Sequence, residues 1–195
     1  MGATDLPLFP LHTVLFPGGA LKLRIFEPRY LDLIRRCSRD DSRFGVCLVI
    51  DGEEAGAPAL PAAWGTRARI TDFFSTREGM LGIAATGEAR FRVARTRVRD
   101  NGLIVGEVQA FEEAPPEELR PEHCLLGQLL ERLHDQVGGS LRADKACYDD
   151  AAWVGYRLAE LLPFSNAHRQ ALLQDDDPHS RLQRITELLP QLRRA

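Results

Sequence analysis

The spacing of apolar residues changes near the middle of the chain, and this change limits the folds open to it. In the first half, apolar and polar residues alternate in short runs, among them 20–26, 66–74 and 90–99. Alternation with a period of two predicts strands that bury one face. After a polar, proline-bearing stretch at 112–121, leucines recur at helical spacing. The pattern predicts an α+β chain in which a β-rich part precedes a helical part.

We expect residues 1–112 to form a small β-rich pseudo-barrel of about six or seven strands with one inserted helix. Glu27 followed by Pro28 is typical of a helix start, and the apolar residues after it predict about three turns. The run 44–50 is apolar throughout, which favours a central strand with both faces buried. The opening segment 6–17 carries prolines, so we expect edge or irregular strands there.

Two local signals refine the β-rich part. Five arginines form a row along one predicted strand: Arg90, Arg92, Arg95, Arg97 and Arg99. They occupy even positions before Ala94 and odd positions after it. A β-bulge near Ala94 would keep the row on one face and let the sheet curl. Asn101-Gly102 lies between two alternating runs and predicts a type I′ hairpin turn.

We expect residues 113–195 to form a bundle of four helices. The first predicted helix, 122–137, ends at Gly138-Gly139 and carries an apolar stripe of Leu125, Leu126, Leu129, Leu130, Leu133 and Val137. Each later helix follows a residue type that caps helices: Asp149 or Asp150 before 151–162, Ser165 before 166–174, and Asp175–Asp177 before the helix that starts near Pro178.

Composition excludes several classes of protein. A hydrophobic content of 44% over 195 residues is enough for a packed core, which excludes wholesale disorder. No run reaches the about 18 apolar residues that a membrane span needs, and the first residues lack a signal-peptide pattern. We therefore expect a cytoplasmic protein. A net charge of −3 does not predict a nucleic-acid-binding protein, and the four cysteines lack the C-x-x-C spacing of a metal site.

The sequence carries no enzyme signature. It lacks the P-loop of ATPases, the G-x-G-x-x-G and H-E-x-x-H motifs, and the G-x-S-x-G nucleophile elbow. Ser140 and Lys145 are spaced for a conceivable dyad, but both fit a polar loop better. His134-Asp135 could serve a triad, but a histidine that interacts with the helix dipole is the better interpretation. We expect no catalytic residue, no cofactor and no metal.

Three features suit binding instead. The arginine row could contact phosphates, although a solvated face paired with acidic residues is the more economical interpretation. Phe73 and Phe74 are adjacent in a predicted strand and should point to opposite faces, so one of them could be exposed and anchor a partner. The alternative is that this ring packs under the neighbouring loop. The long loop predicted at 51–65 contains Trp64, which could flank a groove.

The segments 6–34, 65–111 and 158–189 resemble, in this order, the N-terminal substrate-binding domain of Lon proteases. The opening LPLFPLHTVLFPGG and the FEPRY of residues 26–30 carry most of the likeness, and FEPRY resembles stand-alone members. The resemblance implies a PUA-like pseudo-barrel followed by a helical bundle. It also makes Glu27, Arg29 and Tyr30 candidates for a functional surface. The structural alternative is that Glu27 and Arg29 brace the helix while Tyr30 fills the core.

The resemblance implies a non-catalytic module that binds proteins or exposed peptide segments, in a substrate-recognition, adaptor or holdase-like role. Its partners would be other proteins, with a separate Lon protease among them. The alternative is a PUA-like module that binds nucleic acid through the arginine face. Binding to phosphates should weaken steeply as salt increases, whereas binding to apolar peptide should not.

Overall fold

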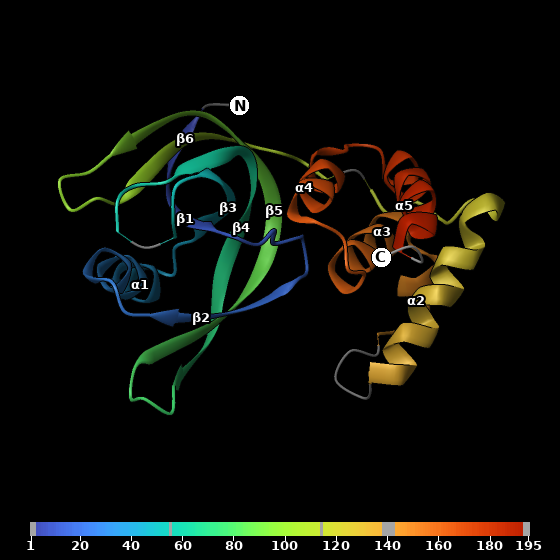
Figure 1. The fold of residues 1–195 in the computed structure, drawn as a ribbon, viewed down its shortest axis with the longest axis horizontal. Helices are drawn as coiled ribbons and strands as arrows, with labels where there is room; N and C mark the ends of the chain where they lie inside the picture. The colour runs from blue at the N-terminus through green and yellow to red at the C-terminus, as the bar shows by residue number, and fades with distance from the viewer. Residues whose placement is uncertain (1–2, 55, 114, 138–142, 193–195) are drawn as a thin grey trace. The chain divides into compact units, whose positions relative to one another are not determined.

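A computed structural model describes residues 3–54, 56–113, 115–137 and 143–192 (Figure 1). The chain is a mixed α+β protein, as predicted, and divides into two compact units, Met1–Glu113 and Ala114–Ala195. The expected helix end at Gly138-Gly139 and the conceivable dyad residue Ser140 lie outside the described residues.

The first unit is built on one six-stranded sheet with the order β2-β5-β4-β3-β1-β6. Because β5 also pairs with β6, the ladder returns to itself and the strands curve around a common interior (Figure 1). The strands are β1 (Thr4–Leu11), β2 (Ala20–Ile25), β3 (Phe44–Asp51), β4 (Leu60–Ser75), β5 (Leu81–Val98) and β6 (Ile104–Ala110).

The long strand β5 closes the ring because its two ends have different partners. Its first residues pair with β2, and the segment from Phe91 onward pairs with β6. The register with β6 shifts between Val93 and Arg95, which confirms the bulge predicted near Ala94. Such a bulge increases the local twist of a sheet and helps it to curve.

Two predictions about the strands are wrong in detail. Strand β1 is not an edge strand, since Thr4–Pro7 pairs with β6 and Leu8–Leu11 pairs with β3. Each half is bonded mainly on one side, which is how a strand tolerates prolines inside a sheet. The 99–103 hairpin is not type I′, because Gly102 has a φ of 81° while Asn101 is not among the residues with positive φ. The backbone N–H of Arg99 instead donates to the Leu103 carbonyl, and this bond encloses a three-residue loop with glycine at its left-handed position.

The predicted helix is α1 (Pro28–Asp40), and Glu27 is its N-cap residue. The apolar residues at helical spacing in this segment, Tyr30, Leu33, Ile34 and Cys37, are buried. These side chains pack into one core cluster with residues of β1 and β3, and the Tyr30 ring stacks on Phe9 with centroids 3.9 Å apart. The apolar spacing of α1 therefore explains how the helix is fixed to the ring.

The second unit contains the four predicted helices: α2 (Cys124–Val137), α3 (Ala151–Leu161), α4 (Asn166–Gln174) and α5 (Pro178–Leu192). Three caps are confirmed. Asp150 accepts hydrogen bonds from the backbone of Ala152 and Trp153, Ser165 accepts one from His168, and Asp177 accepts from His179 and Ser180. The bonds to its backbone partners hold the pKa of Asp177 below its usual value.

One expectation for α2 is wrong: Leu125 does not belong to the buried stripe, because 73% of it is exposed. His134 lies in the last turn of α2, as expected, but it is buried, and its Nδ1 atom lies 2.8 Å from the Tyr148 hydroxyl. Burial lowers the pKa of His134, so the neutral ring fits this site better than the charged form that a helix dipole would favour.

Glu160 gives the second unit a pH-dependent stability. Burial raises its pKa to about 7, although the Arg157 guanidinium lies 3.1 Å from its carboxylate and opposes the shift. A carboxyl that binds its proton more tightly when folded contributes stability below its unfolded pKa, and this contribution is lost as the pH rises through the folded value. For Glu160 that window runs from about pH 4.5 to about pH 7.

We expect Glu160→Gln to reduce the loss of unfolding free energy between about pH 5 and about pH 8 by about 1–3 kcal/mol. Urea denaturation of both proteins across this range measures the difference. Glu131→Gln, on the exposed side of α2, controls for the removal of one negative charge. Parallel profiles for wild type and Glu160→Gln would contradict the assignment.

Candidate functional site

A pocket of about 210 Å³ opens in the first unit beside the start of α1. Buried side chains of Phe9, Leu11 and Tyr30 form its apolar part. Phe26, in the short connection from β2 to α1, lines the pocket while 60% of it stays exposed. The remaining lining residues are Lys22, Leu23, Arg24, Glu27 and Glu54. The pocket thus combines buried apolar side chains with an exposed aromatic ring and charges of both signs.

The loop after β3 lies against this pocket. Glu54 lines the pocket and accepts a hydrogen bond from the backbone N–H of His12. The N–H of Gly56 donates to the Glu27 carboxylate at 3.4 Å. The first part of the predicted 51–65 loop therefore lies beside this pocket, and its role in binding stays a prediction.

The prediction that Trp64 lies in a loop is wrong, because Trp64 lies in β4 and pairs with Arg92 of β5. The ring of Trp64 meets that of Phe111 edge-on at 5.5 Å, and neither residue lines the Phe26 pocket. The segment 60–65 is rich in small residues, so its alternation is weak, and pairing with β3 and β5 decides its structure.

The three residues singled out by FEPRY lie together but differ in what they do. Arg29 is buried, and its Nη2 atom lies 2.9 Å from the Glu27 carboxylate while Nη1 donates to the Gly102 carbonyl at 3.1 Å. Its guanidinium also lies 4.8 Å from the centre of the Tyr30 ring. Arg29 therefore braces the start of α1 against the 99–103 turn, whereas Glu27 and Tyr30 reach the pocket.

Tyr30 is held in its phenol form at this site. Burial raises its pKa, and Glu27 and Glu54 act in the same direction, while Arg29 opposes them. A neutral phenol can donate one hydrogen bond and pack its ring against apolar groups. Tyr30 thus contributes both an apolar ring and a hydroxyl group to the pocket.

Phe73 and Phe74 point to opposite faces of the sheet, as expected for neighbours in a strand. Phe73 pairs with Ile83 of β5, which pairs in turn with Leu23 of β2, so these three side chains share one face. Phe73 is 45% exposed, which confirms that one of the two rings is accessible. Phe74 instead covers Gly82, where a Cβ atom would come 2.2 Å from its ring.

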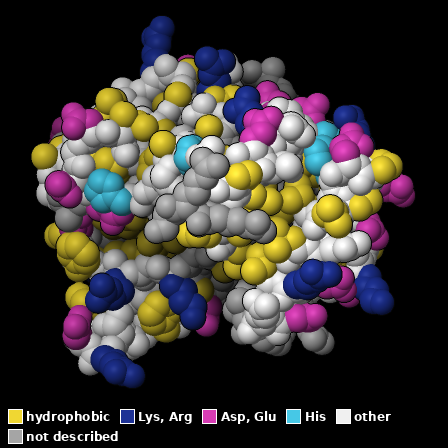
Figure 2. Space-filling view, turned by 45° about the vertical axis from the view of Figure 1, so that its right-hand side comes forward, with side chains coloured by type: hydrophobic (Ala, Val, Ile, Leu, Met, Phe, Trp, Pro, Cys, Tyr) yellow, Lys and Arg dark blue, Asp and Glu magenta, His cyan; other side chains and the backbone are white. Residues whose placement is uncertain are grey.

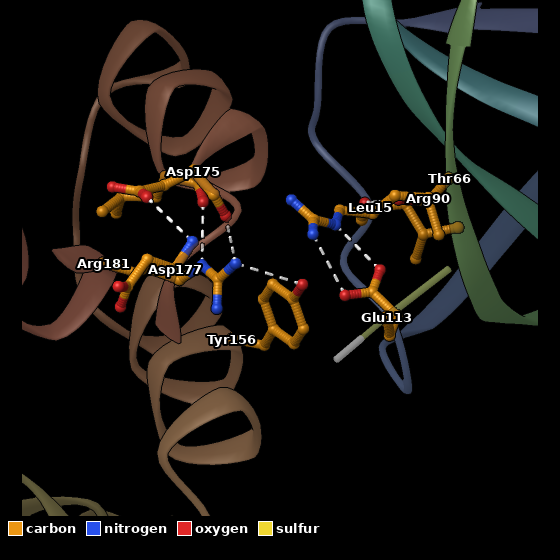
Figure 3. Close-up of polar contacts among 9 residues, drawn as sticks. Leu15, Thr66, Arg90, Glu113, Tyr156, Asp175, Asp177 and Arg181 are labelled. Atoms are coloured by element: carbon orange, nitrogen blue, oxygen red, sulfur yellow. Dashed lines mark hydrogen bonds and ion pairs between the residues drawn. The ribbon is translucent and has the colours of Figure 1, made fainter. Parts of the chain in front are cut away.

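The arginine row is not one continuous exposed face. Arg90 is fully buried, and its guanidinium makes two hydrogen bonds of 2.8 and 3.1 Å with the Glu113 carboxylate (Figure 3). Arg97 is exposed but forms an ion pair with Asp5, which lowers the pKa of that carboxyl. On the surface shown in Figure 2, basic side chains stand apart from one another among acidic and hydrophobic ones.

Two histidines that the sequence did not connect meet in the second unit. The Nδ1 atoms of His123 and His179 are 3.3 Å apart, and Nε2 of His179 lies 3.4 Å from the Glu117 carboxylate. A separation of 56 residues hides such a pair from any analysis of local spacing. Within the described residues, no group of three or more His, Cys, Asp and Glu side chains is arranged to hold a metal ion. Over the same residues, no helix is both long and apolar enough to cross a membrane.

Known proteins confirm the resemblance seen in the sequence. Residues 5–191 match the family model of the ATP-dependent protease La (LON) substrate-binding domain. Lon protease 2 of Myxococcus xanthus is 29% identical in an alignment of 194 residues, which covers 94% of this chain and 23% of that protein. Protein cereblon of Danio rerio is 30% identical over 134 residues, 67% of this chain and 30% of that protein. The chain thus spans less than a third of the length of these relatives.

Solved structures agree. The crystal structure of a Lon N-terminal domain protein from Xanthomonas campestris is 52% identical, with a TM-score of 0.81 over 94% of this chain and 98% of that one. The N-terminal domain of the Mycobacterium avium complex Lon protease shares the fold at 15% identity, with a TM-score of 0.70 over 94% of this chain and 97% of that one. The match of the family model to nearly the whole chain shows that it belongs to the LON substrate-binding domain family.

Proposed function

We propose that this chain is a non-catalytic, cytoplasmic module that binds exposed, partly apolar segments of other proteins, on a ring of the PUA-like pseudo-barrel kind. Membership of a family of substrate-binding domains supports the class of function. The observation that carries the location is Phe26, a large apolar side chain left 60% exposed beside an apolar pocket. Such anchors dominate the binding energy of many protein interfaces.

The binding surface would extend from Phe26 across Leu23 to Phe73, and we call these three residues the apolar strip. Leu23 and Phe26 line the same pocket, and Phe73 shares the sheet face of Leu23. Lys22 and Arg24 are exposed at the pocket and Glu54 lies opposite the same opening, so a client segment would meet both signs of charge. A client segment with apolar residues between polar ones would match the apolar strip and the charges beside it.

Phe26→Ala is expected to weaken binding of a permanently unfolded protein, such as reduced and carboxymethylated α-lactalbumin, by about tenfold. Fluorescence anisotropy of the labelled client measures the change. Leu125→Ala, which removes an exposed side chain of the second unit, should leave the affinity unchanged. Equal affinities of wild type and Phe26→Ala would show that the client does not bind at this pocket.

The aggregation rate of a denatured client distinguishes a holdase role from an adaptor role. A holdase would slow the aggregation of a denatured client, whereas an adaptor would bind it and present it to another protein, for which a separate Lon protease is the partner that the family suggests. Binding of a client with unchanged aggregation would rule out the holdase role.

The nucleic-acid alternative is weaker in this structure. Arg90 is buried against Glu113 and Arg97 is paired with Asp5, so the predicted row of phosphate-binding arginines is interrupted. Salt separates the two functions, because affinity for phosphates falls steeply with ionic strength while affinity for apolar peptide does not. Retention of nucleic acid alone, lost in high salt, would favour the alternative.

A further inference from the structure

A second and larger pocket of about 740 Å³ lies in the first unit, away from the apolar strip. It is lined by the last turns of α1, the first residues of β1, and parts of β4, β5 and β6. Its accessible apolar part consists of the half-buried Pro7 and the small exposed parts of Leu6 and Val108. None of the described residues that line it is aromatic.

Charged side chains surround this apolar lining, and the carboxylates among them are already paired. Asp5 pairs with Arg97 and Asp40 with Arg39. Arg43 pairs with Asp41 at 3.2 Å and with Glu88 at 3.1 Å. Arg69 makes a further contact of 3.2 Å with Glu88. The acidic residues of the pocket are therefore neutralised by arginines within the protein.

Three arginines that line the pocket have no such partner. Over the described residues, the side chains of Arg36, Arg67 and Arg99 form neither a hydrogen bond nor an ion pair, although Arg99 is close enough to Asp5 to help lower the pKa of that carboxyl. Arg67 is the most unusual of them, because its Nε atom is buried without a hydrogen-bond partner. A buried guanidinium nitrogen without an acceptor is costly, so an acceptor that reached Arg67 in this pocket would be favoured.

We infer that this pocket binds an acidic segment of a partner protein. A carboxylate of the segment would accept hydrogen bonds from Arg67, and its flanking apolar side chains would contact Leu6 and Pro7. The inference deepens the proposed function, because it names acidic–apolar sequence as the class of client that this second site selects. Arginine binds carboxylates through paired N–H donors. The residues that line the pocket include no aromatic ring for base stacking, so a peptide fits it better than nucleic acid.

The test uses the full chain and a short fluorescein-labelled peptide that alternates glutamate with leucine. Arg67→Met is expected to weaken its binding at least tenfold. The same peptide with glutamine in place of glutamate should bind as weakly to wild type as the acidic peptide binds to Arg67→Met. Arg92→Met, which removes an exposed arginine of β5 that does not line the pocket, is the matched control and should bind normally.

Stability provides a second readout. Because Arg67 has no partner to lose, Arg67→Met should unfold at the same temperature as wild type or at a higher one. A merely structural arginine would lower that temperature when replaced. Unchanged affinity of Arg67→Met for the acidic peptide, equal binding of the glutamine peptide, or displacement of the acidic peptide by single-stranded DNA would each overturn the inference. Phe26→Ala separates the sites, since it should weaken binding of unfolded α-lactalbumin without weakening binding of the acidic peptide.

Discussion

Replacement of Arg181 by methionine is expected to lower the free energy of unfolding by about 3–5 kcal/mol. Arg181 lies in α5 and is 1% exposed. Its Nε atom donates to the Leu172 carbonyl at 2.9 Å, and Nη2 donates to the Tyr156 hydroxyl at 3.2 Å and to the Asp175 carbonyl (Figure 3). The guanidinium also lies 4.1 Å from the centre of the Tyr156 ring.

The size of this effect comes from the groups that Arg181 would leave behind. Leu172 and Asp175 lie at the end of α4 and just after it, where backbone carbonyls lack partners within the helix. Methionine fills the same space but donates no hydrogen bond, so these carbonyls and the Tyr156 hydroxyl would lose a donor in a buried site. Each buried group left without a partner costs about 1–3 kcal/mol.

Arg184→Met provides the matched control, because it is the same change on the same helix. Arg184 is 53% exposed and lies 3.0 Å from the Asp175 carboxylate. The Asp175 side chain is only 8% exposed but also accepts a hydrogen bond from the Ser180 hydroxyl, so this variant should lose about 1–2 kcal/mol in urea denaturation, less than Arg181→Met. Equal destabilisation by the two variants would show that Arg181 acts only through charge and not through the carbonyls that it holds.

Local signals in the sequence predicted the elements of this fold well. The bulge near Ala94, the start of α1 at Pro28 and the caps Asp150, Ser165 and Asp177 all depend on residues a few positions apart. The errors occur where distant partners decide. Arg90 is buried because Glu113 follows β6, and Trp64 lies in a strand because β3 and β5 pair with that segment.

The same difference between local and distant partners separates the two candidate sites. FEPRY pointed to Glu27 and Tyr30, which line a pocket, because a strand-to-helix connection places neighbouring residues at one surface. The second pocket carried no signal in the sequence. Arg67 is one of many arginines, and only the register of β4 with its neighbours shows that it lacks a partner beside an apolar lining.

Gly65→Ala should destabilise the first unit by about 3 kcal/mol or more. Gly65 lies in β4 and pairs with Cys47 of β3 and Phe91 of β5. A Cβ atom at this position would come 2.4 Å from the Val46 carbonyl oxygen and 2.8 Å from the Phe91 ring. The carbonyl belongs to the backbone of β3, so it cannot move aside without opening the ladder.

Gly106→Ala is the graded control, because the nearest atom to its added Cβ is a methyl of Leu8 at 3.0 Å, which can rotate. Thiol labelling followed by mass spectrometry reports the opening of the ring at one residue. Cys47 is buried inside the ring, and this burial raises the pKa of its thiol, so wild type and Gly106→Ala should label there slowly. Gly65→Ala should label Cys47 much faster, while the exposed Cys124 reacts equally in all three proteins. Slow labelling of Cys47 in Gly65→Ala would mean that Phe91 yields instead of β3, and that closure of the ring does not require glycine at this position.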